Sequence, residues 1–137
     1  MGAVERILKL LLNYTSLLDN VKVEDLDDVY KFFSAVYMLQ AQAQALIDLA
    51  VKAAAALGME VEGYIDAGAK LRAAGVIDED EFKRYRAVVR FRNIVVHQYG
   101  AVDAAVVKRI VRDREYREVA KLAVKIVEEL RRRGADP

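Results

Sequence analysis

The stretch EDLDDVYKFFSAVYMLQAQAQALIDLAVKAAAAL, residues 24–57, decides the fold class of this chain. Acidic residues crowd its first turns, where negative charge complements the positive end of a helix dipole. These residues are Glu24, Asp25, Asp27 and Asp28. No turn residue interrupts the pattern before Gly58. We therefore expect one continuous helix, roughly 50 Å long at 1.5 Å per residue, whose many alanines would let neighbouring helices approach closely.

The rest of the chain also has the pattern of helices separated by turn residues. Apolar residues recur every three or four positions, the only proline is Pro137, and the seven glycines mostly fall between periodic segments. Asp78 and Glu81 have the spacing of a helix N-cap and its capping-box partner, and Asp103 can cap a last helix. The further helices are expected over about 3–18, 64–74, 78–96 and 103–132. These elements predict an all-α, single-domain antiparallel bundle of four or five helices over residues 1–137.

The composition excludes several classes of function. Lys and Arg number 22 and Asp and Glu 21, so the net charge of +1 gives no general attraction to nucleic acid. The absence of cysteine excludes disulfides, thiol catalysis and thiolate metal sites, and one histidine is too few for a typical zinc site. No run of about 18 uncharged apolar residues suggests a membrane span, and the N-terminus does not resemble a secretory signal. We expect a cytoplasmic protein that needs no metal and no cofactor.

The only histidine, His97, lies in VVRFRNIVVHQYG, residues 88–100, at the end of the fourth expected helix. A polar row on one face of that helix consists of Arg86, Arg90, Asn93 and His97. Arg92 falls in an apolar row instead, where a charge is costly unless it is paired or lines a wet cleft. Five residues at 100° each separate Arg92 from His97 by about 140°. Unless the helix distorts near Val96, each side chain needs a partner from another helix or another chain.

The octapeptide RNIVVHQY, residues 92–99, gives this row a second interpretation. On spacing alone, His97 could be a structural residue at a helix end and the arginines could be solvated. The octapeptide reads as Arg, four residues, His, one residue and Tyr, with Asn directly after Arg. It resembles the signature of the HEPN superfamily, and specifically of the HepT toxins of HepT–MntA toxin–antitoxin pairs. The segments QALIDLA, GYIDAGAKLRAAGVID and RNIVVHQYGAVD stand in the order and spacing of that family, so the resemblance extends over essentially the whole chain.

The resemblance implies metal-independent cleavage of RNA by an endoribonuclease. The ribose 2′-hydroxyl attacks the neighbouring phosphorus and leaves a 2′,3′-cyclic phosphate and a 5′-hydroxyl. His97 would move protons near neutral pH, and Arg92 would stabilise the added negative charge on the phosphoryl oxygens. Asn93 would orient the imidazole or a phosphate, and Tyr99 would position the RNA backbone or stack on a base. Substrate positioning is expected from Asn93, Tyr99, Arg86 and Arg90.

One imidazole per chain is too few for a reaction that benefits from both a base and an acid. The family resemblance implies a two-fold homodimer whose two motifs share one composite cleft, which supplies a second imidazole and a second arginine. A polar row on the long helix could line that cleft or be an exposed helix face; it consists of Gln40, Gln44 and Asp48. Since seven residues make almost two helical turns, the Tyr99 hydroxyl is expected near Arg92.

The resemblance also implies a partner protein. A small MntA-like nucleotidyltransferase would neutralise the toxin by transferring AMP from ATP to Tyr99, so nucleotide and Mg²⁺ would be needs of the partner. Two other interpretations stay open: a non-catalytic nucleotide-binding or scaffolding partner of such a nucleotidyltransferase, and a helical dimerisation protein. The basic run 131–133 at the end of the last helix could bind RNA or complement the helix dipole.

Overall fold

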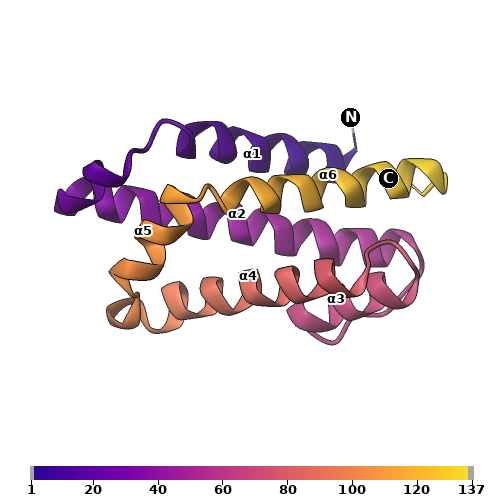
Figure 1. Cartoon of the computed structure of the whole chain (residues 1–137). Coiled ribbons are helices and arrows are strands. Elements are labelled where there is room, and N and C mark those ends of the chain that lie inside the picture. Colours follow the sequence, from indigo (N-terminus) through magenta and orange to yellow (C-terminus); the bar gives the residue numbers. More distant parts are fainter. Residues whose placement is uncertain (1, 136–137) are drawn as a thin grey trace.

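The computed structural model describes residues 2–135, and within that range it contains helices and turns but no strand (Figure 1). The α-helices are α1 (Ala3–Leu18), α2 (Val29–Ala56), α3 (Tyr64–Ala73), α4 (Glu79–His97), α5 (Ala104–Arg112) and α6 (Tyr116–Arg132). Two short 3-10 helices cover Val23–Asp27 and Tyr99–Ala101. The all-α fold predicted from the sequence is therefore confirmed. The expected domain bounds of 1–137 begin and end outside the described residues.

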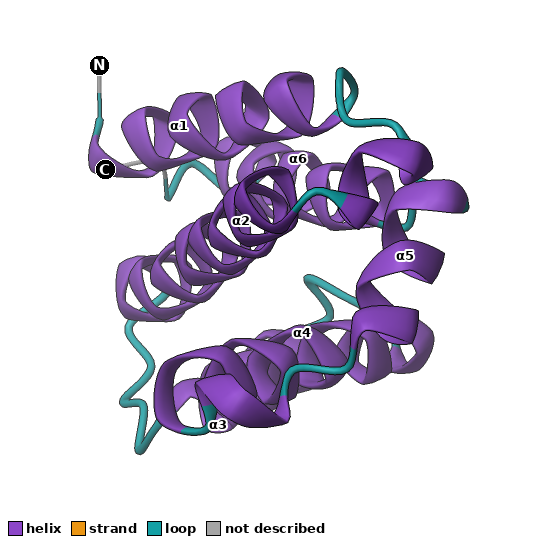
Figure 2. Ribbon diagram, turned by 90° about the vertical axis from the view of Figure 1, so that its left-hand side faces the viewer, coloured by secondary structure: helices purple, strands orange, loops and turns teal. Residues whose placement is uncertain are grey.

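The long helix α2 is the centre of an antiparallel bundle. It packs against α1 and α6 and, lower in the view of Figure 1, against α3 and α4. Figure 1 shows α1, α2, α4 and α6 running along a common direction, with α3 beside the N-terminal half of α4. The short helix α5 crosses the end of the bundle and leads back to α6, as Figure 2 shows from the side. No helix in the described part of the chain is long and apolar enough to cross a membrane.

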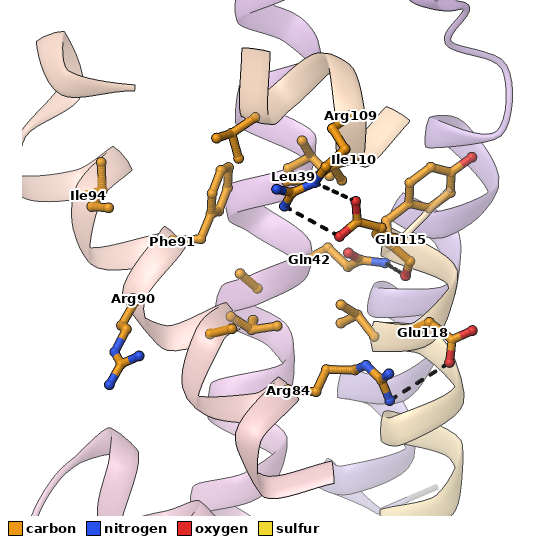
Figure 3. Close-up of a pocket in the computed structure, with 16 residues that line it drawn as sticks. Leu39, Gln42, Arg84, Arg90, Phe91, Ile94, Arg109, Ile110, Glu115 and Glu118 are labelled. Atoms are coloured by element: carbon orange, nitrogen blue, oxygen red, sulfur yellow. Dashed lines mark hydrogen bonds and ion pairs between the residues drawn. The ribbon is translucent and has the colours of Figure 1, made fainter. Parts of the chain in front are cut away.

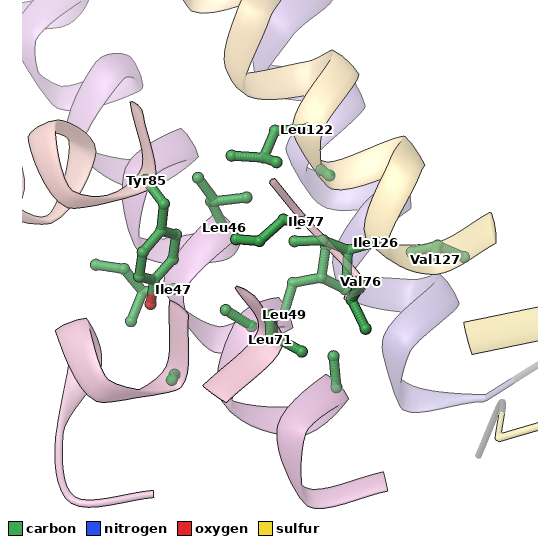
Figure 4. Packing of buried hydrophobic residues seen from close by; sticks show 14 of the residues in the cluster. Leu46, Ile47, Leu49, Leu71, Val76, Ile77, Tyr85, Leu122, Ile126 and Val127 are labelled. Carbon is green, nitrogen blue, oxygen red and sulfur yellow. The ribbon is translucent and has the colours of Figure 1, made fainter. Parts of the chain in front are cut away.

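The main core lies between α2 and the helices around it. Leucine and isoleucine side chains of α2 meet Leu71 of α3, Tyr85 of α4, and Leu122 and Ile126 of α6 (Figure 4). Between them α2 buries small side chains, which allow the neighbouring helices to come close, as the sequence predicts. The buried alanines of α2 are Ala35, Ala43, Ala45, Ala50, Ala53 and Ala54.

Helix α3 approaches α4 closely because Gly68 has no side chain. A Cβ atom at Gly68 would lie 2.4 Å from a carbon of the Tyr85 ring, well inside van der Waals contact. The Tyr85 hydroxyl donates a 2.6 Å hydrogen bond to the Tyr64 carbonyl oxygen at the start of α3. Burial raises the pKa of Tyr85, so this hydroxyl stays protonated and keeps donating. The contact fixes Tyr64 beside the candidate residues on α4.

Helix α2 begins later than the sequence predicts. The expected first turns form a 3-10 helix over Val23–Asp27, and Asp28 then has an extended backbone before α2 starts. The acidic side chains cap amides at these turns: Asp25 accepts a hydrogen bond from the Lys22 amide and Asp28 from the Lys31 amide, each at 3.0 Å. Short acidic side chains compete in this way with a continuous helix.

The expected last helix is in fact two helices, α5 and α6. The chain turns at 113–115, where Arg114 has a φ of 54° in the left-handed region. The turn brings Tyr116 into the bundle, where its carbonyl oxygen accepts a hydrogen bond from Gln42 and its hydroxyl donates to Asp19. Neither glycine nor proline marks 113–115, so the sequence pattern carries no signal of this break.

Two predicted helix starts are confirmed. Asp78 and Glu81 form a reciprocal capping box at the start of α4, in which each side chain accepts a 2.8 Å hydrogen bond from the other's backbone amide. Asp103 caps α5 by accepting from the Ala105 amide at 2.9 Å. The capping box sets the register of α4, the helix that carries most of the candidate residues.

Candidate functional site

Helix α4 presents the candidate residues on two different faces. One face carries the residues that we call the polar ridge: Arg86, Arg90, Asn93 and His97. Arg92 points instead toward α2 and α3, where it contacts Gln44 and Tyr64. Because α4 stays α-helical through His97, no distortion near Val96 brings the two side chains together. Within one chain, Arg92 and His97 therefore point in different directions, as their spacing predicts.

Arg92 is half-buried and held by three neighbours. Its Nε donates a 2.7 Å hydrogen bond to Gln44 Oε1, and its Nη1 donates a 3.0 Å bond to Asn93 Oδ1. Its guanidinium carbon lies 5.4 Å from the centre of the Tyr64 ring, a cation–π distance. Gln44 is itself oriented, because its Nε2 donates to Asp48 Oδ1 at 2.9 Å. The polar row on α2 is thus partly engaged with Arg92 and is not simply an exposed face.

No acidic side chain among residues 2–135 pairs with Arg92. Its two hydrogen bonds go to amide oxygens, and among residues 2–135 it forms no ion pair with a carboxylate. A guanidinium has five N–H donors, so the donors that Gln44 and Asn93 do not use stay available. Hydrogen bonds therefore hold the Arg92 guanidinium in place, and an anion from outside the described residues can still pair with it.

His97 is the last residue of α4 and is exposed to solvent. The helix ends there because Gln98 leaves helical geometry, with φ −139° and ψ 53°. No residue of the described part of the chain forms a hydrogen bond or ion pair with the imidazole. The interpretation of His97 as a capping or hydrogen-bonded structural residue therefore finds no contact to support it.

The other residues of the polar ridge differ in how they are held. Arg86 is half-buried, stacks its guanidinium over the Phe82 ring at 5.2 Å, and has a buried Nε without a hydrogen-bond partner. Arg90 is exposed and makes no ion pair within residues 2–135. Asn93 uses its amide oxygen for Arg92, which leaves its amide NH₂ group free to donate. The ridge therefore offers a free cation and a free donor close to His97 along α4.

Tyr99 does not lie where its helical phase predicts. Since α4 ends at His97, Tyr99 sits in a 3-10 helix, and its ring stacks on Phe33 of α2 with 5.6 Å between centroids and 26° between planes. Phe33 is eleven residues from Gln44, the Arg92 partner, or about 16 Å along α2 at 1.5 Å per residue. The expectation that the Tyr99 hydroxyl lies beside the arginine of its own chain is therefore wrong. The side chain is accessible, with 48% of its surface exposed.

The basic run 131–133 is paired within the chain. Arg132 and Arg133 both contact Glu129, one turn earlier on α6, and Arg131 pairs with Glu5 of α1. Hydrogen bonds and nearby arginines lower the pKa of Glu129, so this carboxylate stays charged. These pairs favour a structural role for the run over the alternative of an RNA-binding patch.

Residues 4–126 match the model of the family described as Ribonuclease HepT-like. The chain belongs to this HepT-like family. The match includes α4 with Arg92 and His97, the following Tyr99, and α2 with the residues that hold Arg92. The resemblance seen in the RNIVVHQY octapeptide is thus confirmed at the level of the family.

A solved structure shares the fold of this HepT-like chain. It is described as the structure of the cytosolic protein of unknown function YutE from Bacillus subtilis. It aligns with a TM-score of 0.83 over 98% of this chain and 92% of its own, at 15% sequence identity. No curated protein matches the chain significantly in sequence.

A row of exposed aromatic residues on α2 escaped the sequence analysis. Together with two apolar residues at the end of α4 and just beyond it, they form what we call the α2–α4 face: Tyr30, Phe33, Tyr37, Val96 and Tyr99. Tyr30 is 82% and Tyr37 59% exposed. The signal was present, since Tyr30, Phe33 and Tyr37 recur every three or four residues, but the alanine face of the same helix dominated the pattern. In this HepT-like chain the face includes Tyr99, and its Val96 stands one helical turn after Arg92 on α4.

The described residues contain no cluster of three or more histidine, aspartate or glutamate side chains that could hold a metal ion. The candidate site presents four kinds of side-chain group. These are a half-buried guanidinium with no ion pair among the described residues, an exposed imidazole, the NH₂ group of a carboxamide and a phenol.

Proposed function

We propose that this HepT-like chain is a metal-independent endoribonuclease and the toxin of a type VII toxin–antitoxin pair. The observation that carries the proposal is the state of Arg92, which two amides position while no carboxylate of the described chain neutralises it. A purely structural arginine at a half-buried site would normally have an acidic partner. An arginine that binds a phosphate needs no acidic side chain as a partner, because the phosphate takes that place.

The proposed reaction forms one bond to phosphorus and breaks another. The ribose 2′-oxygen attacks the adjacent phosphorus, its proton passes to one imidazole, and the bond from phosphorus to the 5′-oxygen breaks. A second, protonated imidazole gives its proton to that leaving oxygen. The products are a 2′,3′-cyclic phosphate and a 5′-hydroxyl. Arg92 stabilises the extra charge on the phosphoryl oxygens with the donors that Gln44 and Asn93 leave free.

Two imidazoles require two chains, because each chain has one histidine. We place the composite cleft at a two-fold homodimer in which His97 of one copy works beside His97 of the other. The α2–α4 face supports this arrangement, since exposed aromatic and apolar side chains of this kind are enriched at protein interfaces. Val96 of this face stands one helical turn after Arg92 on α4, so a copy docked there would bring its own motif toward the same cleft.

Tyr99 is the proposed point of neutralisation. An MntA-like minimal nucleotidyltransferase antitoxin would transfer AMP from ATP to its hydroxyl and release pyrophosphate. The accessibility of Tyr99 and its position before Gly100 support this role. The added nucleotide would lie over Phe33 at the edge of the proposed cleft, where it would exclude RNA by bulk and by phosphate charge. The proposed location is the cytoplasm.

The test of the proposed reaction is RNA cleavage in the presence of EDTA. The parent protein should cleave single-stranded RNA with the chelator present, and His97→Ala should cleave it slower by about 10²–10⁴-fold because a positioned proton-transfer group is lost. Lys9→Gln, at an exposed position of α1, should cleave at the parent rate. Gel analysis would report the rates, and phosphatase treatment would identify the cyclic phosphate end. Equal rates for folded His97→Ala and parent would refute the assignment and favour a non-catalytic scaffolding partner.

A further inference from the structure

A second concave site lies on the opposite side of α4 from Arg92. It is a pocket of about 420 Å³ between α2, α4, α5 and α6 (Figure 3). This volume lies within the range of about 300–1,000 Å³ that small-molecule sites occupy. Most of its wall is apolar, with Leu39 of α2, Phe91 and Ile94 of α4, and Ile110 of α5. The proposed RNA cleavage uses none of these four side chains.

One buried polar side chain points into the pocket without a complete set of partners. Gln42 is 2% exposed, and its Nε2 donates to Thr15 Oγ1 at 2.9 Å and to the Tyr116 carbonyl oxygen at 3.0 Å. Thr15 gives its own hydroxyl proton to the Leu11 carbonyl oxygen, so it must accept from Gln42. These bonds fix the orientation of the carboxamide. Its oxygen therefore lies on the pocket side and accepts no hydrogen bond from the described residues (Figure 3).

An acceptor held in one orientation at the wall of a pocket selects what the pocket takes up, because a ligand with a donor at that point can bond to it. The missing partner is an N–H or O–H group on an otherwise apolar body. The half-buried Phe91 adds a second requirement, because its ring lines the pocket and has no aromatic partner among the described residues. A flat ring system bearing a donor satisfies both Gln42 and Phe91.

The rim of the pocket carries a positive charge that has no acidic partner among the described residues. Arg84 and Arg109 reach it, but they pair with Glu118 and Glu115 (Figure 3). Arg90 also lines the pocket, is exposed, and forms no ion pair in the part of the chain that the structure describes. A ligand that enters with its ring inside can therefore place an anionic group at Arg90.

We propose that this pocket binds a nucleotide, with the base inside and the phosphate at Arg90. The base stacks on Phe91, and one of its N–H groups donates to the Gln42 carbonyl oxygen. The link to RNA rests on the proposed function: Arg90 stands two helical turns before His97 on the polar ridge. A base in the pocket then belongs to a nucleotide near the scissile phosphate, and the pocket selects where the strand is cut. A free mononucleotide presents the same chemistry.

The first experiment measures nucleotide binding, which does not require cleavage. AMP is titrated into the full-length protein by isothermal calorimetry, with ribose 5-phosphate as a ligand that has no base and purine riboside 5′-monophosphate as one whose base has no N–H donor. AMP should bind, the purine analogue should bind about fivefold to tenfold more weakly, and ribose 5-phosphate should bind more weakly still. Equal binding of AMP and ribose 5-phosphate would overturn the proposal.

Two substitutions test the pocket itself. Phe91→Leu keeps an apolar side chain but removes the ring, and should weaken AMP binding about tenfold. Ala87→Leu fills the pocket from an exposed position of α4 and should weaken it at least as much. Ala55→Leu, exposed on α2 and outside the pocket, is the matched control for the added bulk. Parent affinity for AMP in both pocket variants, with unchanged thermal unfolding, would also overturn the proposal.

The two sources of the nucleotide are separated in the His97→Ala background, where RNA is bound but not cut. If Phe91→Leu weakens single-stranded RNA binding in parallel with AMP binding, the pocket holds a base of the RNA. If only AMP binding falls, the pocket serves a free mononucleotide. Both results support the pocket, and AMP binding by a protein that cleaves no RNA would uphold it while refuting the proposed nuclease.

Discussion

Arg92 has no ion-pair partner in the described part of the chain, because the side chains that hold it by hydrogen bonds are amides. Gln44 accepts from the guanidinium and donates to Asp48, so it connects the arginine to a carboxylate without pairing the two charges. At a half-buried position a direct ion pair would compete strongly with any incoming phosphate. The side chain of Gln44 thus orients Arg92 and also insulates it from the nearest acid in its hydrogen-bond chain.

Replacing the amide with an acid of the same shape tests this account. In Gln44→Glu, a carboxylate takes the place of Oε1 and should pair directly with Arg92, so RNA cleavage should fall about tenfold or more because the arginine is neutralised. Thermal stability should change little, because the new ion pair with Arg92 offsets the lost hydrogen bond to Asp48. Gln40→Glu, on the same polar row without a contact to Arg92, is the control for added negative charge. Parent-like cleavage by Gln44→Glu would show that Arg92 does not act through its free charge.

Tyr99 is tested by mass. Co-expression with an active cognate nucleotidyltransferase should raise the mass of the chain by about 329 Da for each AMP added. Tyr99→Phe should show no addition and should escape inhibition, while its ring can still stack on Phe33. Tyr37→Phe removes another exposed phenol and should be modified like the parent. An unmodified parent chain beside an active partner would indicate inhibition by occlusion.

Some features of the site could be predicted from the sequence and others could not. The divergence of Arg92 and His97 follows from helix geometry alone, and the structure confirms it because α4 is regular up to His97. The position of Tyr99 could not be predicted in this way. The expected end of α4 near residue 96 is right to within one residue, but the helical phase does not continue beyond it, and Tyr99 sits in a 3-10 helix where it stacks on Phe33. The burial of Gln42 could not be predicted either, because both acceptors of its amide, the Thr15 hydroxyl and the Tyr116 carbonyl oxygen, lie far away in the sequence.

Among the helices, α3 matters to the site although it carries none of the predicted site residues. Its first residue, Tyr64, lies under the Arg92 guanidinium, and Tyr85 of α4 holds the Tyr64 carbonyl oxygen. The distance between α3 and α4 is set by Gly68 against the Tyr85 ring. A helix-to-helix spacing therefore determines one wall of the Arg92 environment.

Gly68→Ala should move α3 away from α4. Alanine favours a helix over glycine by about 1 kcal/mol, but the new methyl group would overlap a buried ring, so we expect a net loss of about 1–2 kcal/mol in the free energy of unfolding. Gly100→Ala, where a Cβ meets nothing within 4 Å, should be nearly neutral. Urea unfolding followed by circular dichroism measures both. Stability of Gly68→Ala at or above the parent value would mean that the two helices separate without cost.

The boundaries of the helices show where a sequence pattern stops being informative. The capping box of Asp78 and Glu81 was predictable because it depends on residues three apart. The turn at Arg114 was not, because what favours it is distant in sequence: Tyr116 reaches Gln42 and Asp19 only if the chain bends there. A continuous helix satisfies the local pattern equally well.

At the scale of the whole molecule, the α2–α4 face exposes aromatic side chains that have no evident role in a monomer. Aromatic side chains as exposed as Tyr30 and Tyr37 are usually covered in a functional assembly. The arrangement of Arg92 and His97 on different faces of one helix points the same way, since a second copy can supply what each lacks.

We expect a homodimer in solution. Light scattering at micromolar concentration should give twice the mass of the 15.4 kDa chain. Tyr37→Glu should weaken the dimer, because it places a charge in the apolar interface, and RNA cleavage should fall in proportion to the loss of dimer. A parent protein that is monomeric yet cleaves RNA would remove the composite cleft from the mechanism.

The contact between Gln44 and Arg92 has a consequence for the evolution of this gene. Glutamine and glutamate codons differ only in their first base, so one point mutation exchanges the amide for the acid. If the acid pairs with Arg92 as expected, a lineage can silence the proposed nuclease in a single step, with the fold, Tyr99 and every partner surface intact. Descendants that keep the bundle as a scaffold would then lie one nucleotide away from the active gene, and the reverse mutation would restore cleavage.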